Sequence, residues 1–233
     1  MAYQPIFLKV GGLKCMVVGG GEVALRKAAS LLESGAVVTV VSPRVTPALA
    51  TMVRRGRITH VKRRYRRGDM DGCVLVYSAT GGSALNRKLA AEAQERRILL
   101  NVADAPSLCS FIAPAVVRRG ALQIAISTGG DSPAFAGRVR RELEAQYGPE
   151  HALAVEILGA ARRFLRTKIA APAQRARRLA ALANASLTEA LHAGDLAGVE
   201  RLLNNLLGTG IGLEDLGIDP AVIKPARRRA ALS

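Results

Sequence analysis

Three consecutive glycines follow the first apolar run of the chain. Residues 17–24 read VVGGGEVA, which contains the pattern G-x-G-x-x-A. Gly19 permits a tight turn, Gly21 lets the backbone approach a pyrophosphate, and Ala24 lets a helix pack closely on a strand. The N-terminus of that helix adds free N–H groups and a positive dipole end. The pattern predicts binding of a dinucleotide pyrophosphate, and a tight turn without a ligand is the alternative.

The end of the second apolar run lacks the acid that usually accompanies this turn. A dinucleotide-binding unit places Asp or Glu there to hold the ribose hydroxyls, whereas this chain has Ser42-Pro43-Arg44. The Ser42 hydroxyl and backbone groups could hold the ribose, or Arg44 could bind a 2′-phosphate. The choice between NAD and NADP therefore stays open on physical grounds.

Two further polar segments follow later apolar runs. Residues 101–106 read NVADAP, and residues 127–133 read STGGDSP. Open α/β sheets bind ligands where their strands end, so Asp104 is well placed to exchange a proton or approach a metal ion. An Asx-turn before Pro106 is the alternative role for Asp104. Ser132 is expected to cap a helix, because Pro133 takes the favoured first position.

Alternating apolar runs and helical patterns predict an α/β fold with a Rossmann-like parallel sheet. The first expected helix covers residues 23–34 and ends before Gly35. The second covers residues 47–55, and Thr46 is its expected N-cap. From Ala152 onward the chain is rich in Ala, Leu and Arg and shows no strand pattern, so a small all-helical domain is expected there. The other expected helices are residues 85–95 and 133–147, and the expected strands are residues 15–18, 37–41, 58–62, 74–78, 98–102 and 122–127.

Composition excludes several classes of protein. The three cysteines do not form a metal-binding pattern, and Cys15 and Cys73 lie in apolar runs, where we expect small buried side chains rather than a disulfide. The N-terminus has no signal-peptide pattern, and no run of eighteen apolar residues is long enough to span a membrane. A cytoplasmic protein is expected.

A strong positive charge points to an anionic partner. The 34 Lys and Arg residues against 18 Asp and Glu give a net charge of +16. A nucleic acid and a small polyanionic substrate are both compatible with this balance, as is the arginine bias of a GC-rich genome. No helix-turn-helix pattern or aromatic platform is visible, so we do not expect nucleic acid.

Six motifs occur in register along the first part of the chain. They are Pro5-Ile6-Phe7, residues 17–27 (VVGGGEVALRK), Ala79-Thr80, residues 101–106 (NVADAP), residues 110–114 (SFIAP) and residues 127–133 (STGGDSP). Together they resemble the precorrin-2 dehydrogenase and sirohydrochlorin ferrochelatase family, which includes the N-terminal module of sirohaem synthase. The resemblance covers about the first 145 residues, and it is loose over the helical remainder. No methyltransferase domain follows, so the stand-alone form is expected.

The resemblance implies three regions and a nicotinamide site. The expected regions are an NAD-binding Rossmann domain over residues 1–113, a dimerisation region over residues 114–150, and a helical domain with a basic tail over residues 151–233. The tail is residues 224–233. NAD is the implied cofactor, and Thr80, Asn101 and Val102 are expected on its nicotinamide side. The full set of expected cofactor-binding residues is Gly19, Gly20, Gly21, Glu22, Val23, Ser42, Pro43, Arg44, Thr80, Asn101 and Val102.

The implied reaction is the NAD-dependent oxidation of precorrin-2 to sirohydrochlorin, with Asp104 as general base. Ferrous or cobaltous ion insertion is a further implied activity, in which Asp104 is a candidate metal-site group. The substrate carries acetate and propionate arms, which arginines bind well. The family implies a homodimer that makes contact after Pro114. The residues expected to bind substrate are Ser127, Thr128, Gly129 and Arg138.

Two rival hypotheses remain at this stage. One is a chelatase alone, in which the dinucleotide-binding unit has lost its role. The other is a redox-sensing protein that binds nucleic acid through its basic surface, which predicts duplex binding with a steep salt dependence.

Overall fold

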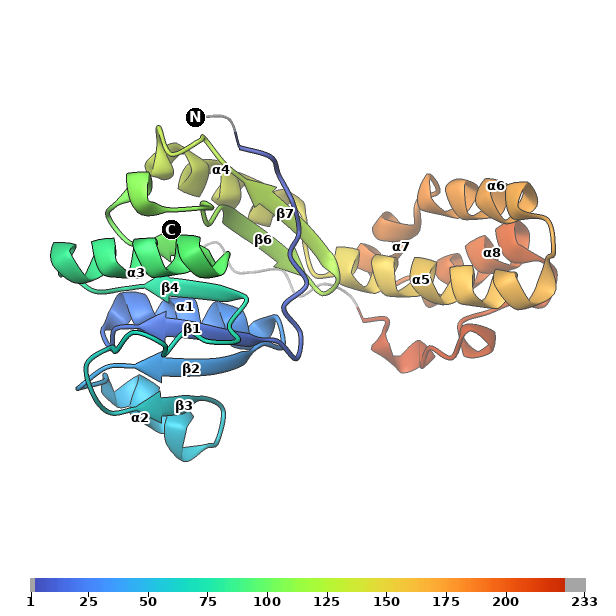
Figure 1. Cartoon of the computed structure of the whole chain (residues 1–233). Coiled ribbons are helices and arrows are strands. Elements are labelled where there is room, and N and C mark those ends of the chain that lie inside the picture. The colour runs from blue at the N-terminus through green and yellow to red at the C-terminus, as the bar shows by residue number, and fades with distance from the viewer. Residues whose placement is uncertain (1–2, 225–233) are drawn as a thin grey trace. The chain divides into compact units, whose positions relative to one another are not determined.

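The computed structural model describes residues 3–224 and divides them into two compact units (Figure 1). The first unit runs to Ala113 and includes Gly129–Asp131. The second holds Pro114–Thr128 and continues from Ser132. Apart from Lys224, the basic tail predicted for residues 224–233 lies outside the described residues.

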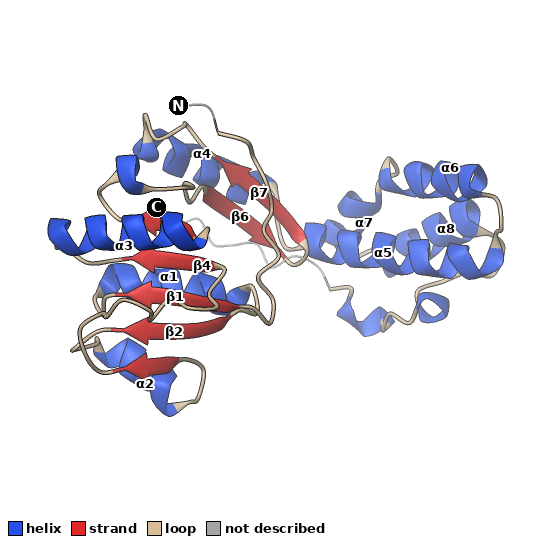
Figure 2. Cartoon of the chain, viewed as in Figure 1, coloured by secondary structure: helices blue, strands red, loops and turns tan. Residues whose placement is uncertain are grey.

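The first unit is built on a five-stranded parallel sheet (Figure 2). The strand order is β3-β2-β1-β4-β5. Strand β1 is therefore central, with β2 and β3 on one side of it and β4 and β5 on the other. Cys15 of β1 lies beside Val38 of β2 and Leu75 of β4. The strands are β1 (Lys14–Val18), β2 (Val37–Val41), β3 (Thr59–Val61), β4 (Leu75–Ser78) and β5 (Leu99–Val102).

Helices cover both faces of this sheet, which explains why its central strands are apolar without interruption. Cys15 and Val17 pack with buried residues of α1 and α2 on one face. Met16 and Val18 pack with buried residues of α3 on the other. The helices are α1 (Glu22–Glu33), α2 (Pro47–Arg54) and α3 (Ser83–Arg96), and the short η1 (Pro106–Leu108) follows β5. The predicted Rossmann-like fold is confirmed.

One strand does not belong to the parallel sheet as predicted. Residues 122–127 were expected to continue it, but β7 (Leu122–Ile126) pairs antiparallel with β6 (Ala115–Arg119) in a separate hairpin. The sequence analysis did not predict β6. Arg119 lies opposite Leu122, so the turn contains two residues, and Gly120 at its first position has φ +57°. Positive φ at that position is what a tight hairpin requires.

The remaining described elements, after the hairpin, are helices. Helix α4 (Pro133–Gln146) packs on β6, and the helices after it enclose a core that includes Ile157, Leu182 and Leu203. None of the described helices is long and apolar enough to cross a membrane. These later elements are α5 (Glu150–Lys168), α6 (Pro172–Ala183), α7 (Leu187–Ala193), α8 (Leu196–Leu207), η2 (Glu214–Leu216) and η3 (Pro220–Val222).

Candidate functional site

The glycine turn joins the end of β1 to the start of α1. Gly19 has φ +123°, and a Cβ there would lie 2.4 Å from the carbonyl oxygen of Ala79, so only glycine fits. Gly21 is the N-cap of α1, and a Cβ built on it meets nothing within 4 Å. Ala24 is completely buried against the sheet. The turn therefore leaves open space directly before the free N–H groups of α1.

Gly20 has a role that the glycine pattern does not reveal. A Cβ on Gly20 would lie 1.9 Å from the carbonyl oxygen of Arg44. The backbone N–H of Thr46 donates to the carbonyl of Gly20 over 2.9 Å. The Ser42 hydroxyl donates to the carbonyl of Arg44 over 2.6 Å. Gly20 thus allows residues 42–46 to pack on the glycine turn.

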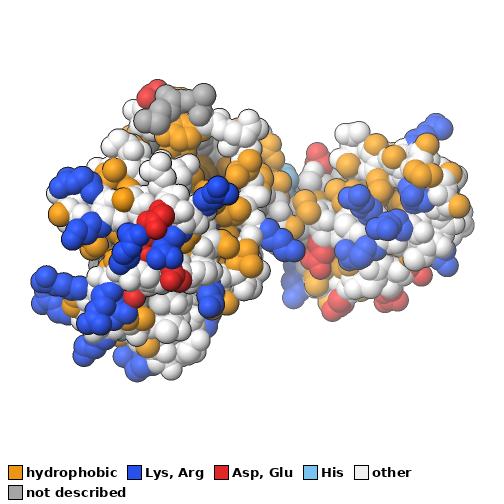
Figure 3. All heavy atoms as spheres, viewed as in Figure 1, with side chains coloured by type: hydrophobic (Ala, Val, Ile, Leu, Met, Phe, Trp, Pro, Cys, Tyr) orange, Lys and Arg blue, Asp and Glu red, His pale blue; other side chains and the backbone are white. Residues whose placement is uncertain are grey.

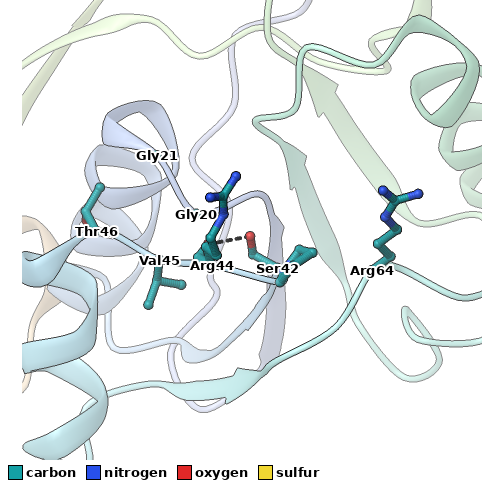
Figure 4. Close-up of a pocket in the computed structure, with 8 residues that line it drawn as sticks. Gly20, Gly21, Ser42, Arg44, Val45, Thr46 and Arg64 are labelled. Atoms are coloured by element: carbon teal, nitrogen blue, oxygen red, sulfur yellow. Dashed lines mark hydrogen bonds between the residues drawn. The ribbon is translucent and has the colours of Figure 1, made fainter.

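Two adjacent hollows lie beside this turn, and both include Ser42, Pro43 and Arg64. The first has a volume of about 570 Å³ (Figure 4). The second, of about 490 Å³, is more apolar and reaches Tyr65 and Lys88. The other residues of the first hollow are Gly20, Gly21, Arg44, Val45 and Thr46, and those of the second are Val18, Gly19, Val41, Thr80, Ala84 and Leu85.

The arginine-rich segment after β3 is held by two acids. Asp69 accepts two hydrogen bonds of 2.7 Å from the Arg63 guanidinium, which holds the pKa of that carboxyl below its usual value. Glu92 of α3 is 2% exposed and accepts from the Tyr65 hydroxyl over 2.9 Å and from the backbone N–H of Gly68 over 2.8 Å. Burial and the bond to Glu92 raise the pKa of Tyr65. These contacts fix the backbone on both sides of Arg64.

The three residues predicted on the nicotinamide side lie in different surroundings. Thr80 lines the second hollow, and its hydroxyl donates to Asn86 over 3.2 Å. Asn101 donates from its amide to the carbonyl of Phe111 over 3.0 Å. Val102 is buried. Of the other predicted cofactor residues, Glu22 is exposed and Val23 half-buried in the first turn of α1. The cofactor roles of these five residues stay predictions.

Asp104 follows β5, at the same edge of the sheet as the glycine turn, because parallel strands end together. Its side chain is exposed, and its φ is +61°, which is uncommon outside glycine. Within residues 3–224 its carboxylate accepts no hydrogen bond, so the alternative Asx-turn is not formed. The same residues contain no group of three His, Cys, Asp or Glu side chains suited to a metal ion.

The segment that is predicted to bind substrate connects β7 to α4. Thr128 accepts a hydrogen bond from the backbone N–H of Ser132 over 3.0 Å. The Ser132 hydroxyl accepts from the N–H of Phe135 over 3.3 Å, which confirms the predicted cap. Ser127 is exposed, and Gly129 has φ +68°. Nε of Arg138 lies 3.6 Å from Oε1 of Glu142, and the Arg138 guanidinium lies over the ring of Phe135. Substrate binding by these residues stays a prediction.

Comparisons with known proteins match two family models in sequence order. Residues 6–115 match the model described as "Putative NAD(P)-binding", and residues 119–146 match "Sirohaem biosynthesis protein central". Together they take in the parallel sheet, β7 and α4.

Curated relatives carry the name siroheme synthase. The protein of Azotobacter vinelandii is 40% identical over 210 residues, which are 87% of this chain and 44% of that protein. The protein of Pseudomonas aeruginosa is 39% identical over 91% of this chain and 45% of its own length. This chain therefore spans less than half the length of these relatives.

A solved structure named "SirC, precorrin-2 dehydrogenase" has the same fold. It superposes with a TM-score of 0.73 at 23% identity, over 88% of this chain and 98% of that one. This likeness covers the sheet and the helical part alike. The family models and the curated relatives confirm the resemblance that the sequence motifs predicted, and the solved structure shows the same fold.

Proposed function

We propose that this chain binds a nicotinamide dinucleotide and uses it to oxidise precorrin-2 to sirohydrochlorin. The observation that carries the proposal is the open space at Gly21, where a Cβ would meet nothing within 4 Å. A site of this shape before the first N–H groups of α1 suits a pyrophosphate. The family model for NAD(P) binding and the names of the relatives support the same cofactor class and substrate.

The surrounding residues fit the rest of such a dinucleotide. The more apolar hollow, which reaches Val41 and Leu85, suits a flat ring of the dinucleotide. The hollow beside Ser42 and Arg44 suits a ribose. We propose NAD as the cofactor because the family resemblance implies it.

We assign one step of the proposed oxidation, the removal of a proton, to Asp104. When bound, the nicotinamide supplies the acceptor for two electrons and one hydrogen from the substrate. Oxidation of precorrin-2 also releases one proton, and we propose that the exposed Asp104 carboxylate takes it. Because no group of the described residues donates a hydrogen bond to this carboxylate, its oxygens are available to the substrate.

Substrate binding is proposed from charge and from the family motif. The acetate and propionate arms of precorrin-2 are anionic, and arginine forks and backbone N–H groups bind carboxylates. Ser127, Thr128, Gly129 and Arg138 are the proposed contacts. The glycines of this motif also leave room, since a Cβ on Gly129 meets nothing within 4 Å.

Metal insertion and dimer formation are secondary parts of the proposal. Asp104 has an exposed carboxylate that could guide a ferrous or cobaltous ion as substrate, and unchanged insertion in Asp104→Ala would contradict this role. A homodimer formed through the segment after Pro114 is proposed from the resemblance. A monomeric mass in analytical ultracentrifugation at micromolar concentration would contradict it.

Asp104→Asn tests the catalytic assignment. Asparagine tolerates positive φ, so this variant is expected to fold and to bind the dinucleotide normally. Loss of the base is expected to lower the anaerobic rate of sirohydrochlorin formation by about 100-fold or more. A rate within twofold of the unsubstituted chain would remove Asp104 from the reaction.

A further inference from the structure

Strand β5 is the outermost strand on one side of the parallel sheet, so half of its backbone groups must find partners outside the sheet. Its inner side pairs with β4, and the N–H groups of Leu100 and Val102 point to the open side. The chain returns to this open side after η1. Residues 109–111 then supply the missing partners, two of them through side chains.

These two side chains bind different parts of β5. The Ser110 hydroxyl accepts a hydrogen bond from the N–H of Leu100 over 2.8 Å, and the Ser110 N–H donates to the Leu100 carbonyl over 2.8 Å. The Cys109 thiol accepts from the N–H of Val102 over 3.1 Å. Its sulfur also lies 3.4 Å from the carbonyl oxygens of both Val102 and Ala105, to which the S–H can donate. Ser110 therefore holds the strand, whereas Cys109 holds the turn that follows it.

The turn that Cys109 holds carries Asp104. The N–H of Ala105 donates to the carbonyl of Val102 over 3.5 Å, which places residues 103 and 104 at the centre of a tight turn. Asp104 is the second central residue, and its φ of +61° is one that glycine adopts more readily. A hydrogen bond as long as 3.5 Å is weak. The Cys109 thiol bridges the same two residues, Val102 and Ala105, and so closes the turn.

The direction of the Asp104 carboxylate depends on this backbone. The side chain is exposed, and none of residues 3–224 donates a hydrogen bond to it. In the space-filling view, Lys and Arg side chains gather along the edge of the first unit where β1 and β2 end (Figure 3). On a mobile turn, the carboxylate would be free to pair with cations of this kind. A closed turn restricts where the carboxylate points.

We propose that Cys109 is a positioning residue for the oxidation, because its thiol fixes the turn that directs the Asp104 carboxylate at the substrate. The inference rests on the proposed function, in which Asp104 takes the proton. A general base must lie within hydrogen-bond reach of the proton that it removes. A displacement of about 1 Å can lower a rate by about 100-fold. The thiol acts only through Asp104 and takes no part in the proton transfer.

The test measures kcat and KM for the anaerobic oxidation of precorrin-2 by the full chain, and the dissociation constant of the cofactor by calorimetry. Cys109→Ala is expected to lower kcat by about tenfold, because the base is then held less precisely. The dissociation constant of the cofactor is expected to stay unchanged. Cys109→Ser keeps one donor and one acceptor at this position, so it is expected to restore kcat to within about threefold of the original value.

Ser110→Ala is the matched control. It removes a side-chain partner from the same edge of β5, but that partner does not contact the turn of Asp104. We expect it to destabilise the first unit and to leave kcat unchanged. A loss of kcat as large as that of Cys109→Ala would overturn the inference, because a general loosening of β5 would then explain both results.

Combining Cys109→Ala with Asp104→Asn tests whether the thiol acts through Asp104. The inference predicts that Cys109→Ala has no further effect on the residual rate of the Asp104→Asn chain. An equal loss in both backgrounds, or an unchanged kcat in Cys109→Ala alone, overturns the inference and leaves the proposed function standing. If the unsubstituted chain forms no sirohydrochlorin, both the proposed function and the inference are overturned.

Discussion

Gly20 and Gly21 are neighbours in one turn, yet the structure predicts opposite consequences for replacing them with alanine. At Gly20, the new methyl group would lie 1.9 Å from the Arg44 carbonyl oxygen and 2.8 Å from the Ser42 hydroxyl. At Gly21, it would meet nothing within 4 Å. Gly20→Ala is therefore expected to damage the fold, and Gly21→Ala to damage ligand binding alone.

The size of the Gly20→Ala effect follows from the contacts at Arg44. Two hydrogen bonds hold this segment, one from Thr46 to Gly20 and one from Ser42 to Arg44. Their loss costs about 1–3 kcal/mol together, and overpacking against backbone adds about 1–3 kcal/mol. The free energy of unfolding of the first unit should fall by about 2–6 kcal/mol.

Gly21→Ala involves two small effects of opposite sign. Alanine is a poorer N-cap than glycine, but it also restricts the unfolded chain. The free energy of unfolding should change by less than about 1 kcal/mol. Dinucleotide affinity should fall by about tenfold or more, because the methyl group occupies space that the pyrophosphate needs and each lost charge-assisted bond is worth about 1.5–3 kcal/mol.

The assay combines urea unfolding, hydrogen exchange of peptides from β1 and β2, and calorimetric titration of the dinucleotide. Hydrogen exchange reports on the first unit alone, so the helical part does not obscure the result. A Gly20→Ala variant as stable as the original chain would refute the packing argument. Normal dinucleotide binding by Gly21→Ala would refute the placement of the pyrophosphate.

Three further predictions follow from other contacts. Glu92→Gln should lower the free energy of unfolding, measured in urea, by about 1–3 kcal/mol, because three groups donate hydrogen bonds to this buried carboxylate. The control is Glu95→Gln, at an exposed ion pair, which should change the free energy of unfolding by less than about 1 kcal/mol. Equal effects of the two substitutions would contradict the account. Burial, with a smaller effect of Cys73, raises the pKa of Cys15 to about 11, so its thiol should resist iodoacetamide in the folded chain at pH 8, and rapid alkylation would show that it is accessible. Because an unfolded thiol ionises near pH 8.5, the same shift should lower the free energy of unfolding as pH rises from about 8.5 toward 11, and Cys15→Ala should lessen that fall.

Most of the first unit could be predicted because its strands are continuously apolar and its turns are marked by glycine and proline. The run from Cys15 to Val18 is buried on both faces, as its composition predicts. Strand β6 could not be predicted in the same way, because its five residues end in Arg118 and Arg119. Without β6 as a partner, residues 122–127 were assigned to the wrong sheet.

The site was predictable where a residue type alone determines its role, as at Gly19. It was not predictable where the role depends on distant partners. The sequence shows four arginines between residues 63 and 67, but only the fold shows that Asp69 and Glu95 engage two of them and that Arg64 faces the hollow. The close approach of Arg44 to Gly20 is likewise a product of the fold.

Anaerobic incubation of the full chain with precorrin-2 and either NAD+ or NADP+ tests the central claim most directly. The measurement is the amount of reduced cofactor and of sirohydrochlorin formed, each followed by absorbance. The account predicts that both appear together in equal amounts, and only when the oxidised cofactor is present. Tight cofactor binding without any sirohydrochlorin would contradict the proposed oxidation.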